Sequence, residues 1–172
     1  VEAEGASRSL FTQGYKYMFA VLSTSEYYLA PVLDLVAQRA KAGWKSPSEL
    51  RIGMAFENDG FSLDVRAGVL DVAKKYRMKI VIDDKLPADL SDMSATLTKF
   101  KALRPDILLV SGHSKGAATA ARQIEEMKIN ASAISITHCE AAKVHVKFPK
   151  SANGILCPTQ WLTNLPNNEP LF

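Results

Sequence analysis

Four short apolar segments, separated by stretches with helical periodicity, constrain the fold of this chain most strongly. They cover residues 50–56, 79–83, 106–111 and 133–137. Strands that are apolar along most of their length and alternate with helices are typical of a parallel sheet covered on both faces. The sequence therefore predicts an α/β fold: a three-layer, doubly wound, mostly parallel sheet with helices on both faces. Ligands bind such sheets beyond the carboxyl ends of the strands, so the loops that follow the strands are the candidate functional segments.

Helices are predicted before and between these strands. The first should be capped within residues 23–25 and run to about Ala42, with Pro31 in its early turns, where proline is tolerated only near the first turn. The other helices are expected at residues 62–76, from Ser91 or Asp92 to Leu103, and from about Lys115 onward, and two further strands are expected at residues 17–22 and 154–158.

Composition excludes several classes of protein. A chain of 172 residues, of which 47% are hydrophobic, can bury the core of one domain. Its net charge of +3 is too small and too scattered to favour nucleic acid as a partner. No apolar run approaches the ~20 residues that a membrane span needs, so direct membrane insertion is not expected. The chain also begins without the charged and apolar pattern of a signal peptide.

The two cysteines, Cys139 and Cys157, each lie at the end of a predicted strand. They could therefore be close in space, and their spacing does not decide whether they pair. We expect them to be free, small, buried side chains.

Acidic residues follow the first central strand. Glu57, Asn58 and Asp59 could hold a metal ion or a phosphoryl group, or they could form a solvated turn that caps the next helix. Phosphorylated receiver domains also need an Asp at the end of the middle strand and a Lys at the end of a later one. Ser111 and Thr137 stand at those positions, which argues against a receiver domain.

The loop at residues 112–116 has the sequence GHSKG and joins a strand to a helix. Its glycines allow close backbone approach, and the N-terminus of the following helix favours an anion or a carbonyl oxygen. An ordinary tight turn is the alternative, because neither the Walker spacing nor GxGxxG is present.

Two histidines, His113 and His138, fall at strand ends. With Cys139 they could suggest zinc, but adjacent residues of a strand point in opposite directions and no closely spaced ligand pair remains. Ser114 lacks the GxSxG spacing of a hydrolase nucleophile. We therefore expect no metal, no cofactor and no catalytic residue.

Taken in order, these segments resemble one lobe of a type I periplasmic binding protein, in the group that binds branched-chain amino acids and amides. The motifs are spread over most of the chain: YKYMF at 15–19, IGMAFENDGF at 52–61, KFKALRPDILLVSG at 99–112 and NGILCPTQW at 153–161. The resemblance implies a sheet with the flavodoxin-like strand order.

The resemblance implies a binding protein without catalytic activity. It would be a two-lobed receptor that closes on a small molecule and delivers it to the permease of an ABC transporter. The implied location is the periplasm, or the cell exterior as a membrane-anchored lipoprotein in a Gram-positive organism. Residues 1–22 would be a remnant of the first lobe and a crossing strand, residues 23–157 the second ligand-binding lobe, and residues 158–172 a crossing segment back toward the first lobe. Hinges are expected near residues 22–24 and 157–159.

The resemblance also carries over ligand contacts. Phe61 matches the family's aromatic residue after the first central strand, and His113 matches the position of a ligand-contacting tyrosine. The acidic residue that binds a ligand's ammonium group would fall at Thr137 or His138, and neither is acidic. This departure argues against an α-amino acid, although amino acids stay among the candidate ligands, and it leaves amides, short acids and hydroxylated aromatic acids open. The predicted ligand-binding residues are Phe61, His113, His138, Asp59, Ser114 and Thr137.

Other functions use the same fold. A ligand-sensing domain of a regulator or receptor is the main alternative. A flavodoxin-like carrier is disfavoured because the acidic loop after the first central strand would repel phosphate, and a hydrolase is a further alternative. An isolated lobe should also expose apolar side chains that the other lobe would cover, so we expect self-association. These side chains are Met18, Phe19, Leu162, Leu165 and Phe172.

Overall fold

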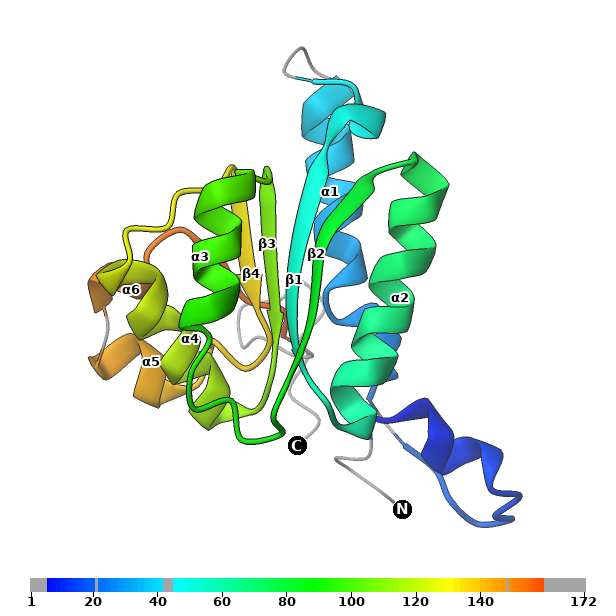
Figure 1. The fold of residues 1–172 in the computed structure, drawn as a ribbon. Helices are drawn as coiled ribbons and strands as arrows, with labels where there is room; N and C mark the ends of the chain where they lie inside the picture. Colours follow the sequence, from blue (N-terminus) through cyan, green and yellow to red (C-terminus); the bar gives the residue numbers. More distant parts are fainter. Residues whose placement is uncertain (1–5, 21, 42–44, 148, 160–172) are drawn as a thin grey trace, which may run out of the picture.

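A five-stranded sheet in the order β2-β1-β3-β4-β5 forms the centre of the computed structural model, which describes residues 6–20, 22–41, 45–147 and 149–159. Every pair of neighbouring strands is parallel. The strands are β1 (Arg51–Glu57), β2 (Lys79–Leu86), β3 (Ile107–Ser111), β4 (Ala133–Ile136) and β5 (Ile155–Leu156). This is the flavodoxin-like order, and it confirms the predicted fold class (Figure 1).

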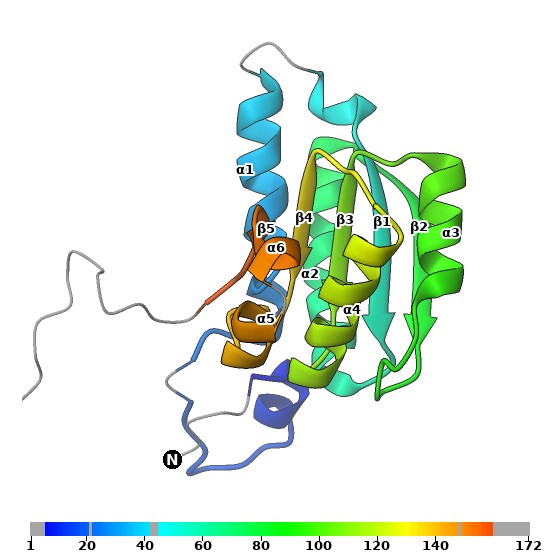
Figure 2. The same cartoon turned by 90° about the vertical axis from the view of Figure 1, so that its left-hand side faces the viewer.

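Helices cover both faces of the sheet, as the views in Figures 1 and 2 show. Helices α1 (Ala30–Lys41) and α2 (Gly60–Tyr76) pack on one face. Helices α3 (Ser94–Leu103) and α4 (Ser114–Glu126) pack on the other. Two short helices, α5 (Ala142–Lys147) and α6 (Pro149–Ala152), contact α4 beside β5.

The core is built by alternation along the strands. Ile52, Met54 and Phe56 of β1 pack among residues of α1 and α2, whereas Ala55 packs with residues of α3 and α4. All four are completely buried. Because successive side chains of a strand point to opposite faces, this one central strand contributes to both layers of the core.

The predicted start of the first helix is wrong by four to six residues. The 3₁₀ turn η2 (Ser25–Tyr27) comes first, and α1 begins at Ala30. Ser25 does not cap α1; its hydroxyl donates to the carbonyl oxygen of Ala6 at 3.0 Å. Pro31, which has no N–H to donate, then falls in the first turn, where that group has no helical partner. The predicted end at Ala42 lies outside the described residues.

The predicted strand at residues 17–22 is also wrong. Among the described residues of that range, only Ala20 makes an isolated bridge. Tyr17 is 85% exposed and Phe19 61% exposed. An apolar run becomes a strand only when a sheet edge pairs with it, and this run has no place in the observed strand order. The second of the two extra strands shortens to β5, and residues 160–172 of the predicted crossing segment lie outside the described residues.

The N-terminal segment packs on α2. The short 3₁₀ helix η1 (Arg8–Thr12) follows Ser7, whose hydroxyl donates to Asp64 at 2.6 Å. The backbone N–H of Arg8 donates to the same carboxylate at 2.9 Å.

A third 3₁₀ turn, η3 (Pro47–Glu49), leads into β1. Every helix in the described part of the chain is too short or too polar to cross a membrane.

Candidate functional site

The loops that follow β1, β3 and β4 meet at one edge of the sheet, because parallel strands all end at the same edge. Asp59 directly precedes α2 and His113 directly precedes α4. His138 lies in the turn after β4. Three sequence segments that are far apart in the chain therefore contribute side chains to one place.

Four rings cluster there around Phe61. Its ring centroid lies 5.2 Å from that of Tyr28, 5.8 Å from His113 and 5.3 Å from His138, and the two imidazoles are 5.7 Å apart. His113 is exposed, and the other three residues are half-buried. The structure thus brings together Phe61, His113 and His138 of the predicted set and adds Tyr28. We refer to these four residues as the ring cluster.

Tyr28 was missed by sequence reasoning because nothing in its local pattern marks it. It follows η2 and reaches the ring cluster because η2 packs on α2, where Gly68 leaves room for the backbone of Glu26. A contact that depends on a 3₁₀ turn packing against a helix farther along the chain leaves no periodic signal in the sequence.

Asp59 caps α2. Its Oδ1 accepts a hydrogen bond of 3.0 Å from the backbone N–H of Ser62. Its Oδ2 lies 3.9 Å from Nε2 of His113, is buried, and accepts no hydrogen bond from a side chain or backbone in the described ranges. Asp59 therefore lies beside the ring cluster with one oxygen committed to the helix and the other facing His113.

Ser114 and Thr137, the remaining predicted residues, differ in their surroundings. Ser114 is half-buried and is the first residue of α4, directly after His113. Thr137 is completely buried, and its hydroxyl both accepts from Gly112 N–H at 2.9 Å and donates to the Gly112 carbonyl oxygen at 2.7 Å. The hydroxyl of Thr137 is therefore used to join the loops after β3 and β4.

His138 has a constrained backbone and a defined ring. Its φ of 58° lies in the left-handed region, which costs a non-glycine residue about 1–2 kcal/mol and is kept only where surrounding contacts enforce it. Its Nδ1 lies 2.9 Å from the carbonyl oxygen of Gly112. Because a carbonyl can only accept, Nδ1 carries a proton, and in the neutral ring Nε2 is left as a hydrogen-bond acceptor.

Glu57, the last residue of β1, is only 1% exposed. Its Oε2 accepts a weak hydrogen bond of 3.4 Å from the backbone N–H of His113. A Cβ at Gly112 or Gly116 would stand 2.6 Å or 2.5 Å from its Oε1, so both glycines make room for this carboxyl group. Glu57 therefore lies beneath the loop that carries His113, and those two glycines were the sequence signal that could have revealed it.

The pKa of Glu57 is raised to about 7, mainly by burial and also by the negative charge of Asp59, while the hydrogen bond from the His113 N–H lowers it. At pH values below 7 the protonated Glu57 can donate to Asp59, whose Oδ2 is otherwise unsatisfied.

Glu57, Asp59 and His113 each offer a ligand atom, and these atoms lie within 4.8 Å of one another. Such a set could hold a cation. Both carboxylates already serve the N-terminal ends of helices, however, since Asp59 accepts from Ser62 and Glu57 from His113. Acidic groups are stabilised at helix N-termini without any metal, so this geometry alone does not assign an ion.

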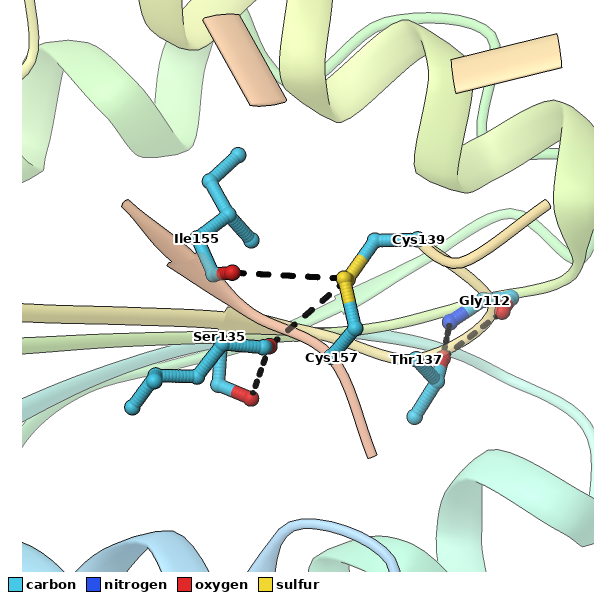
Figure 3. Close-up of a disulfide and its surroundings, with 7 residues drawn as sticks. Gly112, Ser135, Thr137, Cys139, Ile155 and Cys157 are labelled. Atoms are coloured by element: carbon cyan, nitrogen blue, oxygen red, sulfur yellow. Dashed lines mark hydrogen bonds between the residues drawn. A yellow bond between two sulfur atoms is a disulfide. The ribbon is translucent and has the colours of Figure 1, made fainter. Parts of the chain in front are cut away.

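A disulfide joins Cys139, next to His138, to Cys157, which follows β5 (Figure 3). The expectation of two free thiols is therefore wrong. The two Cα atoms are 5.4 Å apart although 18 residues separate them in sequence. They meet because β5 pairs with β4, which brings the ends of both strands together.

Residues just after the first expected hinge segment lie near the second. A pocket of about 300 Å³ is lined by Tyr27 and Tyr28, a few residues after the first hinge segment, and by residues 157–159, the second. Pro31 and Leu35 of α1 complete its apolar wall. Tyr28 thus belongs both to the ring cluster and to the wall of this pocket.

Comparison with known proteins gives concordant matches. A family profile described as periplasmic binding protein matches residues 5–170. The Leu/Ile/Val-binding protein homolog 8 of Brucella abortus is 21% identical over 115 residues, covering 66% of this chain and 28% of the relative.

Two solved structures extend the comparison. An extracellular ligand-binding receptor from Verminephrobacter eiseniae superposes with a TM-score of 0.75 at 15% identity, over 96% of this chain and 45% of its own. An ABC transporter solute-binding protein from R. palustris in complex with benzoate gives a TM-score of 0.69 at 16% identity, over 88% and 39%. The chain thus spans less than half the length of each of these proteins.

Proposed function

Because the chain belongs to the periplasmic binding protein family, we propose that it forms one lobe of a two-lobed solute-binding component of an ABC transporter. The observation that carries the proposal is the ring cluster at the carboxyl edge of the sheet, where Phe61, His113 and His138 converge. Sheets of this kind bind ligands at that edge, and a cleft between two lobes would enclose a molecule held there.

We propose a small polar or amphipathic ligand, such as an amino acid, an amide or a small aromatic acid. One relative carries a name for Leu/Ile/Val binding, and one structural neighbour is described in complex with benzoate, which supports both aliphatic and aromatic candidates. In this chain Tyr28 and Phe61 supply flat apolar surface, and Nε2 of His138 and the exposed ring of His113 supply polar groups. A few polar groups on an apolar wall are typical of such sites.

The proposed division of the chain keeps residues 23–157 as the ligand-binding lobe. Residues 1–22 and 158–172 would connect it to a first lobe. The hydrogen bonds that Ser7 and Arg8 make to Asp64 support a refinement of the first boundary. We propose that residues 6–12 pack against this lobe and that the segment connecting it to the first lobe begins after them.

The proposed partner is the permease of an ABC transporter, and the proposed location is the periplasm or the cell exterior. The Cys139–Cys157 disulfide supports that location, because disulfides persist in oxidising compartments and are rare in the cytosol of most organisms. The proposed role is binding without catalysis.

Calorimetric titration of a protein that carries both lobes tests the assignment. The probes are L-leucine, L-valine, benzoate and benzamide. Phe61→Ala and His113→Ala should each weaken binding of the accepted probe by about 1–3 kcal/mol, which is roughly 5- to 150-fold. Leu103→Ala is the matched control, since Leu103 ends α3 at the opposite edge of the sheet and is 41% exposed.

The isolated lobe should bind the same probe far more weakly, because half of the cleft is missing. If both variants stay folded and neither changes the affinity by more than about twofold, the ligand does not bind at the ring cluster.

A further inference from the structure

The Cys139–Cys157 disulfide connects two segments with different tasks in the proposed function. Cys139 directly follows His138 of the ring cluster and is 1% exposed. Cys157 directly precedes Pro158 and Thr159, where the chain leaves the lobe. The disulfide, drawn in Figure 3, is therefore a covalent bond between the neighbour of a candidate ligand contact and the neighbour of a candidate hinge.

The backbone pairing that holds β5 to the lobe is short. Strand β5 has two residues, which pair with Ile134 and Ser135 of β4. The hydroxyl of Ser135 donates to the carbonyl oxygen of Leu156 at 2.7 Å. Sγ of Cys139 lies 3.6 Å from the same oxygen, but a disulfide sulfur has no proton to donate. A strand this short at the edge of a sheet is weakly held by its ladder alone.

The turn that carries His138 is held from two sides. On one side Gly112 accepts hydrogen bonds from the Thr137 hydroxyl and from Nδ1 of His138. On the other side Cys139 is bonded to Cys157. Between these two anchors His138 adopts its left-handed backbone, a conformation that needs such enforcement in a residue with a side chain.

We infer that the Cys139–Cys157 disulfide positions His138, holding its ring as the Nδ1–H tautomer with Nε2 free, and ties this geometry to the segment by which the chain leaves the lobe. The inference rests on the proposed function only in treating His138 as a ligand contact. Cys139 and Cys157 are positioning residues: they act through His138 and through residues 158–159.

Without the disulfide, the Thr137 hydroxyl still donates to Gly112, but the covalent anchor at Cys157 is lost. The turn at His138 should then relax from its left-handed backbone, and the Nδ1 hydrogen bond to Gly112 should break. The imidazole of His138 would then be solvated, and its proton would lie mainly on Nε2. Nε2 would therefore change from a hydrogen-bond acceptor to a donor.

Long-range ¹⁵N–¹H NMR of the histidine rings tests this on the chain as it exists, without any ligand. The wild-type chain is compared with the double variant Cys139→Ser/Cys157→Ser. It is also compared with wild type in excess dithiothreitol, which splits the S–S bond into two thiols and is itself oxidised to its cyclic disulfide. Wild type should show the Nδ1–H pattern for His138, and both disulfide-free samples should lose it.

Two internal controls accompany the spectra. The tautomer pattern of His113, whose Nε2 lies 3.9 Å from Asp59 and which carries no bond to either cysteine, should stay unchanged. Ser135→Ala removes the hydrogen bond to Leu156 but keeps the disulfide, so it should retain the Nδ1–H pattern of His138. Amide exchange of Leu156 and Cys157 should accelerate at least about tenfold in the disulfide-free samples, while that of β1 and β3 stays slow.

Two outcomes overturn the inference. One is an unchanged Nδ1–H pattern for His138 after complete loss of the disulfide. The other is loss of the dispersed amide signals of β1 and β3, which would make the disulfide a global staple and not a local positioning device. Because no ligand is present, either outcome leaves the proposed binding function open to its own test.

Discussion

At the scale of single residues, Glu57 is a carboxyl group held out of water at the end of the central strand. The charged form loses hydration there and gains only one weak hydrogen bond, from the N–H of His113. Its pKa is therefore raised to about 7 from its ordinary value of 4.5, mainly by burial. The ionisation of this group falls within the physiological range of pH.

The raised pKa predicts how stability depends on pH. Between pH 4.5 and about 7 the folded state keeps a proton on Glu57 that the unfolded chain releases, so raising the pH through this window lowers the free energy of unfolding. Since one pKa unit corresponds to about 1.4 kcal/mol, the full loss is about 3 kcal/mol. Glu57→Gln, which resembles the neutral form, should remove this loss.

Urea unfolding at pH 5 and pH 8 measures the effect. The free energy of unfolding of wild type should fall between these pH values by about 2–3 kcal/mol more than that of Glu57→Gln. The exposed Glu140 at the same edge provides the control, and Glu140→Gln should keep the wild-type dependence. Equal pH dependence for wild type and Glu57→Gln would contradict the account.

The sequence predicted part of this edge. Phe61, His113 and His138 follow three different strands, and parallel strands end at the same edge of a sheet, which predicts that these residues lie close together. In the structure the centroids of their rings are within 5.8 Å of one another. The pairing of Cys139 with Cys157 was not predictable in this way. It depends on the two-residue strand β5 adding to the edge of β4, and strand order at an edge is a tertiary property.

At the scale of elements, the contact between η2 and α2 places Tyr28 in the ring cluster. A Cβ on Gly68, in the middle of α2, would stand 1.9 Å from the carbonyl oxygen of Glu26. Only a residue without a side chain allows the backbone of η2 to lie this close. Gly68 thus lowers the helix propensity of α2 but allows close packing of α2 against the backbone of η2.

Gly68→Ala should therefore destabilise the protein, although alanine is the better helix former. We expect a loss of about 1–3 kcal/mol in urea unfolding, because η2 must move away from α2. Gly60→Ala is the matched control: its Cβ would meet only Ser7 Oγ at an ordinary 3.8 Å, so this change in the first turn of α2 should be neutral or slightly stabilising. A Gly68→Ala protein as stable as wild type would show that η2 does not pack as described.

Helices and strands with a clear periodicity of apolar residues were predicted well. Those whose position depends on tertiary contacts were not. The four apolar strands and α2 come from local pattern, and the structure confirms them with bounds shifted by a few residues. The run at 17–22 has the composition of a strand, but its described residues do not join the sheet. The start of α1 was misplaced because Ser25 bonds to Ala6, a contact between distant parts of the chain.

At the scale of the whole molecule, aromatic side chains stand in solvent on the segment before α1. Tyr15 is 65% exposed, Tyr17 85% and Phe19 61%, and Met18 is half-buried. Leu162, Leu165 and Phe172, the other side chains expected to be exposed, lie outside the described residues. We expect this surface to be covered by the other lobe in a two-lobed protein.

Self-association of the isolated chain follows from that exposed surface. Sedimentation velocity should show a weight-average mass that rises with concentration. The double variant Tyr17→Ser/Phe19→Ser should reduce the rise, whereas Leu103→Ser at the far edge of the sheet should not. A clean monomer at the highest concentration would count against the expectation.

In a two-lobed binding protein, we expect this lobe to hold a small molecule at the ring cluster. The most direct test of this claim is to purify the two-lobed protein without added ligand, denature it, and analyse the released small molecules by mass spectrometry. Wild type should release one small polar or amphipathic compound in amounts comparable to the protein, and Phe61→Ala/His113→Ala should release far less of it. Equal amounts from wild type and from a folded double variant, or no compound from wild type, would contradict the claim.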